Sequence, residues 1–205
     1  MQVVELILLR HGETDYNRQQ RVQGWRDVPL TGIGRAQARA VAVRLAEAGP
    51  FDHFVTSDLI RAAETARIIG EAVGMTPEVD SAWRECNLGA WEGKTLEEVE
   101  ALSPTRQSLG RLGLDACPHG GESRRQLQVR VTAAAEALAQ RFPEGRVLVV
   151  THGGPIRLLV GSVLGLDESG LAALVADSVS IHRVEWTDPG WRVLGLNDTC
   201  HWPDD

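Results

Sequence analysis

Apolar residues along this chain form short continuous runs that alternate with longer stripes of period three to four. The runs are typical of strands buried on both faces of a parallel sheet, and they predict strands over residues 3–9, 53–56 and 147–150. The stripes predict amphipathic helices over residues 32–48, 59–73, 123–141 and 156–163. A hairpin is predicted around Asp188-Pro189-Gly190, with strands over residues 179–186 and 191–196. This alternation predicts an α/β sandwich with a mostly parallel sheet and an antiparallel pair near the C-terminus.

Capping residues predict where two of these helices begin and end. Thr31 is expected to start the first helix, and Gly49-Pro50 to stop it. The helix after the second strand is expected to be capped by Ser57 or Asp58 and ended by Gly74.

The segment near residues 93–122 interrupts the alternation of strands and helices. It holds a short predicted helix from Leu96 to Leu102, then a Ser-Pro pair, several glycines and Cys117-Pro118. One interpretation is a surface connection, and the other is a lid or specificity insertion over a site, because long loops in compact domains are commonly functional. A length of 205 residues is closest to one domain, so we expect a single domain over residues 1–205 with this insertion.

Composition and charge narrow the class of protein. Hydrophobic residues at 43% and charged residues at 24% are typical of a globular protein rather than a disordered one. The 21 Lys and Arg against 28 Asp and Glu give a net charge of -7, which argues against binding to nucleic acid or to an anionic membrane. The same global charge is unfavourable to an anionic substrate, unless the local field of the site differs from it.

Cysteine usage and targeting signals predict a cytoplasmic protein. Cys86, Cys117 and Cys200 are widely spaced and form no CxxC pair, which favours a reducing compartment. No apolar run approaches the ~18 residues of a transmembrane helix. The run over residues 3–9 has no basic residue before it and no A-x-A pattern after it, so we do not expect a signal peptide.

Side chains capable of chemistry follow the three predicted parallel strands. The first strand leads into Arg10-His11-Gly12, the third into His152-Gly153-Gly154, and the second to Arg61 in the next helix. Ligands of open parallel sheets bind outside the carboxyl ends of the strands, so these groups would meet in one crevice if the strands are neighbours. Glycine after each histidine lets the backbone approach a ligand, and exposed N–H groups there favour an anion.

A metal site and a phosphoryl-transfer site are the two interpretations of the paired histidines. A metal site requires carboxylates at ligand spacing, yet no HxH, HExxH or DxD string accompanies His11 or His152. A phosphoryl group fits better, because Arg10 and Arg61 can bind a phosphate dianion through bidentate contacts. One neutral imidazole can attack phosphorus, while a second, protonated by the anion, donates to the equatorial oxygens.

An alkoxide leaving group also requires a proton from a nearby carboxylic acid. Composition and spacing do not choose among the nearest acids, which are Glu13, Glu64, Glu85 and Glu92. The other histidines are expected to serve packing or the surface; they are His53, His119, His182 and His201.

A series of motifs, in order along the chain, resembles the histidine phosphatase superfamily, which contains the phosphoglycerate mutases and related acid phosphatases. The motifs are Leu9-Arg10-His11-Gly12-Glu13-Thr14 with Asn17, Gly24-Trp25-Arg26-Asp27, Leu30-Thr31-Gly32-Ile33-Gly34, Thr56-Ser57-Asp58-Leu59-Ile60-Arg61-Ala62, Glu85-Cys86-Asn87-Leu88-Gly89-Ala90-Trp91-Glu92-Gly93, Gly120-Gly121-Glu122-Ser123 and Val150-Thr151-His152-Gly153-Gly154. The resemblance spans roughly residues 3–200. It implies a three-layer α/β/α, phosphoglycerate mutase-like fold and an activity that needs no metal or cofactor.

The resemblance also implies a role for each matching residue. His11 is similar to the nucleophile that becomes phosphorylated, and Glu85 aligns with the proton donor. The catalytic residues that act on the reacting phosphate are expected to be Arg10, Arg61 and His152. The residues expected to bind the substrate are Arg10, Asn17, Gln23, Gly24, Arg61 and Gly153.

Phosphatase and mutase are the two activities that the resemblance implies. Mutases of the family are typically longer and carry a Tyr-Gly-x-Leu-Gln-Gly-Leu string, whereas the strings from Leu88 to Gly93 and from Gly120 to Ser123 are similar to the phosphatase branch. A mutase must also bind a carboxylate, and only Lys94 and Arg26 are evident near the motifs for that purpose.

We therefore expect a metal-independent phosphomonoester hydrolase that acts on a small-molecule phosphate ester through a phosphohistidine. The alternatives are a cofactor-dependent phosphoglycerate mutase, a non-catalytic phosphate-binding relative and a regulator that recognises a phosphoprotein. Members of the family occur as monomers, dimers and tetramers, so the resemblance is compatible with a homodimer.

Overall fold

The computed structural model describes residues 3–102 and 113–202 and contains a six-stranded sheet in the order β3-β2-β4-β1-β5-β6. The strands are β1 Val3–Arg10, β2 His53–Thr56, β3 Glu78–Val79, β4 Glu144–Thr151, β5 Ile181–Thr187 and β6 Gly190–Asp198. The first four strands are parallel, and β5 and β6 are antiparallel to their neighbours. The α-helices are α1 Asp15–Arg18, α2 Gly32–Ala48, α3 Ile60–Val73, α4 Leu96–Leu102, α5 Arg124–Arg141, α6 Gly153–Val163 and α7 Glu168–Ala173; short 3-10 helices span Ser81–Trp83 and Gly89–Trp91.

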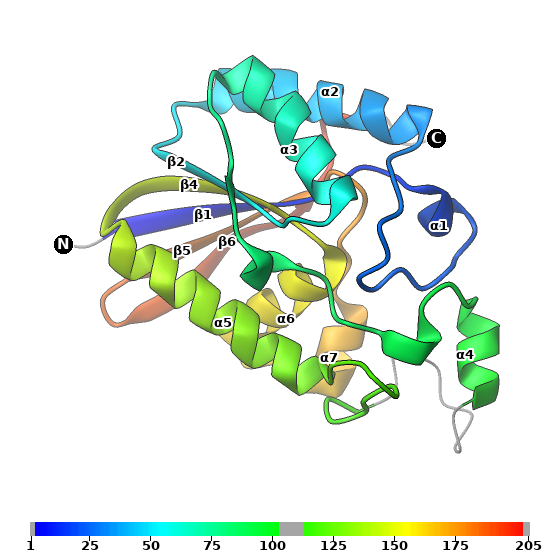
Figure 1. The fold of residues 1–205 in the computed structure, drawn as a ribbon. Coiled ribbons are helices and arrows are strands. Elements are labelled where there is room, and N and C mark those ends of the chain that lie inside the picture. Colours follow the sequence, from blue (N-terminus) through cyan, green and yellow to red (C-terminus); the bar gives the residue numbers. More distant parts are fainter. Residues whose placement is uncertain (1–2, 103–112, 203–205) are drawn as a thin grey trace.

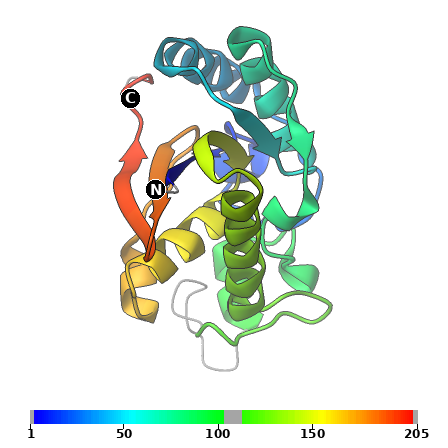
Figure 2. The same ribbon diagram turned by 90° about the vertical axis from the view of Figure 1, so that its left-hand side faces the viewer.

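Two helical layers enclose the sheet, and the predicted three-layer α/β/α fold is confirmed (Figure 1). Helices α2 and α3 cover one face, while α5 and α6 cover the other, as the view turned by 90° also shows (Figure 2). A hydrophobic core lies on each face of the sheet, and alternate residues of β1 contribute to both. Leu6 and Leu8 pack toward α5 and α6, whereas Ile7 and Leu9 pack toward α2 and α3. This two-sided burial explains why β1 reads as a continuous apolar run.

The predicted cap of α3 is wrong, whereas the predicted cap of α2 is confirmed. Thr31 accepts a hydrogen bond from the first turn of α2. Helix α3, in contrast, begins after Leu59, which makes no side-chain cap. The Ser57 hydroxyl instead lies 2.9 Å from Nε2 of His152, and Asp58 forms an ion pair with Arg84. Both candidate capping side chains therefore make tertiary contacts at the site and do not cap α3.

The sequence analysis did not predict the short elements. Each is too brief to generate a periodic pattern; they are helix α1, strand β3, helix α7 and the two 3-10 helices. Helix α4 has the predicted bounds, but residues 103–112 of the expected insertion lie outside the described residues, so its action as a lid stays a prediction. None of the described helices combines the length and apolar character needed to cross a bilayer.

The sheet order brings the functional strands together. Strand β4 lies between β1 and β2, with Arg10 level with Thr151 and Thr56 level with Val150. The carboxyl ends of these parallel strands therefore open at one edge of the sheet. In Figure 1 this is the right-hand end of the strands, beside α1 and α4. The condition set by the sequence, that the strands are neighbours, is met.

Candidate active site

A pocket of about 380 Å³ opens at this edge of the sheet and collects most of the predicted site residues. Those that line it are Arg10, His11, Asn17, Gln23, Gly24, Arg61, Glu85 and Gly153. His152 is fully buried next to it, with its ring centroid 5.1 Å from that of His11 in an edge-on arrangement. Residues separated by up to 143 positions in the sequence thus converge on one cavity.

The His11 imidazole is held in one orientation, with its lone pair on Nε2. Its Nδ1 lies 2.7 Å from the carbonyl oxygen of Gly12, which can only accept, so Nδ1 carries the proton. Nε2 accepts a hydrogen bond from Nε of Arg61 at 3.2 Å. Burial, then the charges of Arg61 and Arg10, hold the pKa of His11 well below its usual value. A neutral imidazole with this tautomer presents Nε2 as a nucleophile.

Arg61 is fixed by the backbone of the loop that follows α1. It donates to the carbonyl oxygens of Gly24 at 2.8 Å and Arg26 at 2.9 Å. Burial lowers the pKa of Arg61 to about 10, which still leaves the guanidinium charged near neutral pH. A fully buried cation whose neighbour is a neutral histidine is suited to receive an anion.

Two buried nitrogen atoms of the site have no hydrogen-bond partner among the described residues. They are Nε of Arg10 and Nδ1 of His152. An unpaired buried donor costs about 1–3 kcal/mol, so native proteins rarely retain one without a reason. Burial, and next the positive charge of Arg61, hold the pKa of His152 well below its usual value. A bound phosphate oxyanion would give both nitrogens an acceptor and would favour protonated His152.

Glu85 is the one of the four candidate acids that lines the pocket. Its carboxylate accepts hydrogen bonds from the backbone N–H of Cys86 at 2.8 Å and of Gly154 at 3.1 Å. The second of these contacts joins Glu85 to the first turn of α6, directly after His152. The other three carboxylates bind outside the pocket: Glu13 to the Thr31 hydroxyl, Glu64 to Arg35, and Glu92 to the backbone N–H groups of Trp25 and Leu88.

Asn17, Gln23 and Gly24 form the wall on the side of the loop after α1. The Thr14 backbone N–H donates to the side-chain oxygen of Asn17 at 3.1 Å, and the Thr14 hydroxyl donates its one proton to that of Gln23 at 2.9 Å. With their oxygens bound to Thr14, the two amides have their NH2 groups left as donors. Gly24 has φ 55°, and a Cβ there would lie 2.1 Å from a carboxylate oxygen of Glu92, so this position requires glycine.

A match to known proteins identifies the family. The model of the "Histidine phosphatase superfamily (branch 1)" matches residues 6–199. The chain belongs to the histidine phosphatase superfamily. A curated relative from Escherichia coli, named "Probable phosphoglycerate mutase GpmB", is 37% identical over 206 residues, covering 97% of this chain and 95% of the relative.

Solved structures of superfamily members share the whole fold. A mycobacterial glucosyl-3-phosphoglycerate phosphatase in complex with VO3 is 34% identical, with a TM-score of 0.84 over 94% of this chain and 98% of that one. The YhfR protein of Bacillus stearothermophilus is 31% identical, with a TM-score of 0.87 over 97% of this chain and 98% of that one. The predicted family and its extent along the chain are therefore confirmed.

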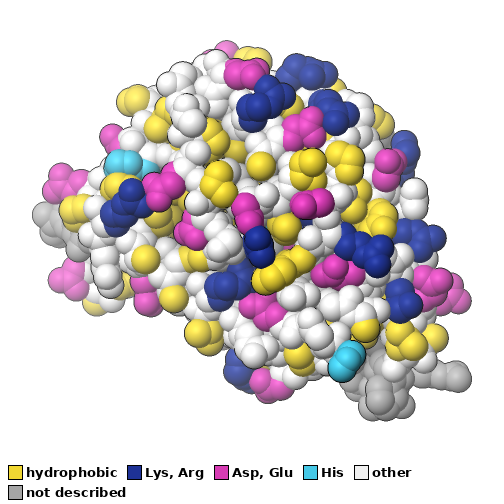
Figure 3. Space-filling view, in the orientation of Figure 1, with side chains coloured by type: hydrophobic (Ala, Val, Ile, Leu, Met, Phe, Trp, Pro, Cys, Tyr) yellow, Lys and Arg dark blue, Asp and Glu magenta, His cyan; other side chains and the backbone are white. Residues whose placement is uncertain are grey.

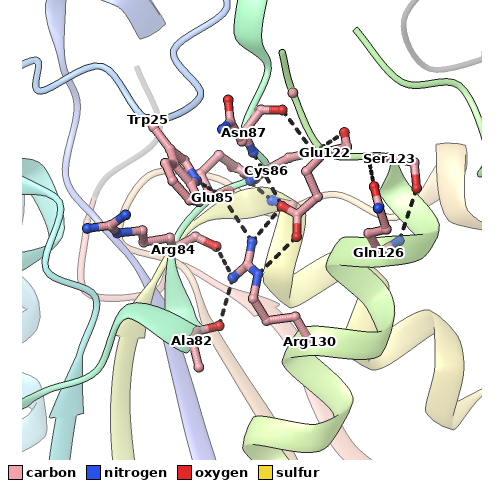
Figure 4. A network of polar contacts seen from close by, with 12 residues as sticks. Trp25, Ala82, Arg84, Glu85, Cys86, Asn87, Glu122, Ser123, Gln126 and Arg130 are labelled. Atoms are coloured by element: carbon pink, nitrogen blue, oxygen red, sulfur yellow. Dashed lines mark hydrogen bonds and ion pairs between the residues drawn. The ribbon is translucent and has the colours of Figure 1, made fainter. Parts of the chain in front are cut away.

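The sequence interpretation missed Arg130, which holds the loop that carries Glu85 (Figure 4). Projecting from α5, Arg130 donates to the carbonyl oxygens of Ala82 at 2.8 Å, Arg84 at 3.0 Å and Glu85 at 3.2 Å. The same guanidinium forms an ion pair with Glu122 at 2.7 Å. Three carbonyls of one short loop thus bind one side chain, which fixes the backbone from which Glu85 projects toward the pocket.

Lys94 and Arg26, the two basic residues that the sequence offered near the motifs for binding a carboxylate, lie outside the pocket lining. The carbonyl of Arg26 serves as a support for Arg61. Arg124 and Arg157 line the pocket instead. Both lie in predicted helices, where an arginine is ordinarily assigned to the solvated face, so the pattern alone carried no signal for them.

The remaining histidines lie outside the pocket lining, as expected. His53 stacks on Phe142, and His182 is buried beside the Ser180 hydroxyl, where burial lowers its pKa to about 4. His201 lies near Arg44, and His119 is exposed. Within the described ranges, no group of three or more His, Cys, Asp or Glu side chains is arranged to hold a metal ion.

Proposed function

We propose that this superfamily member is a metal-independent phosphomonoester hydrolase that acts through a phosphorylated His11. The observation that carries the proposal is the tautomer of His11, with Nδ1–H bound to Gly12 and an Nε2 lone pair held at the pocket by Arg61. The phosphatase names of solved relatives support hydrolysis, and one of those relatives binds VO3, an oxyanion related to phosphate.

In the first step, Nε2 of His11 attacks phosphorus and the bond from phosphorus to the ester oxygen breaks. Arg10, Arg61 and protonated His152 donate to the non-bridging oxygens, where negative charge is held during transfer. Glu85, as the carboxylic acid, gives its proton to the departing alkoxide. The products are an alcohol, a phosphohistidine and the carboxylate of Glu85.

In the second step, water attacks the phosphohistidine and Glu85 takes a proton from that water. The bond from phosphorus to Nε2 breaks, the lone pair returns to His11, and inorganic phosphate leaves. Glu85 is again protonated, so the cycle is closed without a metal or a further reactant.

Phosphoglycerate mutase activity is a second candidate, favoured by the name of the Escherichia coli relative and by the extra arginines of the pocket. Both activities share the first step, and they differ in whether water or a second hydroxyl accepts the phosphoryl group. Release of inorganic phosphate measured against isomerisation of phosphoglycerate, with a bisphosphate primer present, separates them. We expect phosphate release to be the faster reaction.

The protein is expected to hydrolyse p-nitrophenyl phosphate at full rate in the presence of EDTA, because its proposed charge-stabilising groups are side chains. Vanadate is expected to inhibit competitively, since it offers the same oxygens to Arg10 and Arg61. Initial rates with and without the chelator test this directly. Activity that disappears in EDTA and returns with added Mg²⁺ would contradict the proposal.

Substitution Arg130→Met is expected to lower kcat for an alkyl phosphate about 10–100-fold, because misplacing an acid by ~1 Å costs this much. Hydrolysis of p-nitrophenyl phosphate, whose leaving group needs little protonation, should change much less. The ratio of the two rates is the measurement, since simple destabilisation lowers both equally.

Arg146→Met is the matched control for Arg130→Met. Arg146 donates to the carbonyl oxygens of Ala48 and Pro50 and forms an ion pair with Glu5, at the other end of the sheet. It is expected to lower the melting temperature without changing the ratio of rates. If Arg130→Met also leaves that ratio unchanged, Arg130 does not position Glu85.

A further inference from the structure

The turn that carries His11 rests on the first turn of helix α2. The backbone N–H of Thr31 donates to the carbonyl oxygen of Glu13 at 2.9 Å. Gly34 permits this approach, because a Cβ on it would lie 2.1 Å from the same carbonyl oxygen. The motif from Leu30 to Gly34, which contains none of the residues predicted to act on the substrate, therefore lies directly against the turn of the proposed nucleophile.

A buried glutamine of α2 binds the same turn. Gln37 is 8% exposed, and its side-chain oxygen accepts a hydrogen bond from the backbone N–H of Glu13 at 2.9 Å. Gln37 follows Gly34 by three positions, so both residues meet the turn from one side of the helix. Because α2 is a 17-residue helix that packs on the sheet, its side chain gives the turn a rigid support.

The peptide group between Gly12 and Glu13 connects Gln37 to the imidazole of His11. The carbonyl oxygen of this peptide group accepts the hydrogen bond from Nδ1 of His11 at 2.7 Å, and its N–H is the group that donates to Gln37. A peptide group that donates through its N–H is polarised, and its carbonyl oxygen then accepts a hydrogen bond more strongly. Gln37 therefore strengthens the contact that keeps the proton on Nδ1.

The preceding peptide group, between His11 and Gly12, is held by other residues. Its N–H donates to the hydroxyl of Thr65 on α3 at 3.2 Å, and its carbonyl oxygen accepts from the backbone N–H of Val179 at 3.4 Å. Neither hydrogen bond involves the carbonyl oxygen that accepts from Nδ1. Loss of the Gln37 oxygen would therefore leave the backbone of His11 anchored and would act mainly on the acceptor of its imidazole.

The contact at Nδ1 matters most when Nε2 carries the phosphoryl group. The bond from Nε2 to phosphorus uses the lone pair that accepts from Arg61 in the free protein, so the ring loses that hydrogen bond and becomes positively charged. Nδ1–H is then a charged donor, and its hydrogen bond to Gly12 strengthens. A ring that keeps this proton leaves phosphorus as neutral imidazole, whereas a ring without it would have to leave as the far more basic imidazolate.

We propose that Gln37 is a positioning residue for the reaction, which acts through the Gly12–Glu13 peptide group to hold the proton on Nδ1 of His11 while Nε2 takes up and releases the phosphoryl group. This inference deepens the proposed function and rests on it. The bond from Nε2 to phosphorus forms as the ester bond breaks, and it breaks as the bond from phosphorus to water oxygen forms. The Nδ1 proton stays in place throughout, so no further reactant is needed.

Gln37→Met fills a similar space but has no oxygen acceptor, and it is expected to lower kcat for p-nitrophenyl phosphate about 10–100-fold, the effect of an unpaired buried donor. The inhibition constant of inorganic phosphate should stay close to the wild-type value, because Arg10, Arg61 and His152 still bind the anion. Gln37→Glu, which restores an oxygen acceptor for the same N–H, should recover most of the lost rate. A wild-type kcat in Gln37→Met, or phosphate binding that weakens as much as kcat falls, would overturn the role.

Gln126→Met is the matched control for Gln37→Met. The side-chain oxygen of Gln126 also accepts from a backbone N–H, that of Ser123 at 2.8 Å, but at the start of α5. This variant is expected to lower the melting temperature and to leave kcat unchanged. A loss of kcat in Gln126→Met equal to that in Gln37→Met would show a general effect of lost stability and would contradict the proposal.

Nuclear magnetic resonance of protein labelled with 15N at histidine tests the contact without turnover. The Nδ1–H resonance of His11, assigned by its absence in His11→Ala, is expected at low field near pH 7. Gln37→Met should move it upfield and speed its exchange with water roughly tenfold or more, because the acceptor is weakened. Gln37→Glu should move it downfield, and Gln126→Met should leave it in place. The opposite directions keep the test decisive if one of the two Gln37 variants does not fold.

The resonance also separates this inference from the proposed function. If it responds to Gln37 as expected but the wild-type protein forms no phosphohistidine, Gln37 positions the ring and the proposed function is wrong. If phosphohistidine forms and the resonance is the same in every Gln37 variant, the proposed function stands and the role of Gln37 is overturned.

Discussion

His11→Ala is expected to lower kcat for phosphate-ester hydrolysis by about 10⁴–10⁶-fold, the range for removal of a covalent nucleophile. The Nε2 atom of His11 is the proposed attacking atom, and alanine leaves no side-chain nitrogen at this position to form the phosphorylated intermediate. Arg10, Arg61 and His152 would still bind the ester. The loss should therefore fall on kcat, with a KM close to that of the wild-type protein.

The control for His11→Ala is His119→Ala, which removes an exposed imidazole outside the pocket. Initial rates on p-nitrophenyl phosphate, together with the melting temperature of each variant, separate loss of chemistry from loss of folding. If His11→Ala keeps activity within tenfold of wild type, His11 is not the nucleophile. If His152→Ala then loses all activity, the two histidines have exchanged roles.

Glu85→Gln is expected to lower kcat for an alkyl phosphate about 10²–10⁴-fold, the usual contribution of a general acid. The amide keeps the shape of the side chain but has no acidic proton for the alkoxide. p-Nitrophenolate leaves readily without a proton, so hydrolysis of its ester should fall by about tenfold or less. A series of esters with leaving groups of increasing pKa gives a steeper dependence of rate on leaving group in the variant.

Glu64→Gln is the matched control for Glu85→Gln, because Glu64 was an equal candidate from spacing alone and its carboxylate is paired with Arg35. This variant should keep the wild-type dependence on leaving group. Equal losses on alkyl and aryl esters in Glu85→Gln would remove Glu85 from the role of acid.

Strands and long helices were predictable because their burial leaves a recognisable pattern of apolar residues. A strand buried on two faces gives a continuous apolar run, and a helix buried along one stripe gives apolar residues every three to four positions. The pattern placed β2 and α4 at their observed bounds. It began β4 too late, at Val147, because the first residues of this strand are Glu144, Gly145 and Arg146. Arg146 belongs in the sheet through pairing beside Glu5 and an ion pair with that residue, which are contacts between distant parts of the chain.

The candidate site was predictable where a residue type was unusual and unpredictable where it was ordinary. Two His-Gly turns after apolar runs are rare enough to draw attention, and the adjacency of β1 and β4 joins them. Arginines on helices are common, so Arg124, Arg130 and Arg157 carried no signal. Only the packing of α5 against α6 and against the loop of Glu85 reveals what they contact.

The net charge of -7 does not decide whether the protein binds an anion, because binding depends on the local field of the pocket. Acidic and basic side chains are interspersed over the face seen in Figure 3. The pocket lining, in contrast, contains the four arginines Arg10, Arg61, Arg124 and Arg157 against the three glutamates Glu85, Glu100 and Glu122. Because Glu122 is also paired with Arg130, the local balance is positive, and an acidic protein can bind an anion there.

The central claim is a covalent phosphoryl group on His11, and rapid alkaline quench during turnover of p-nitrophenyl phosphate tests it most directly. With this good leaving group the first step should outrun the second, so phosphorylated protein accumulates. Mass spectrometry of the quenched peptides is predicted to place an acid-labile phosphoryl group on His11. Steady hydrolysis with no phosphorylated peptide, or with the group on another residue, would contradict the mechanism.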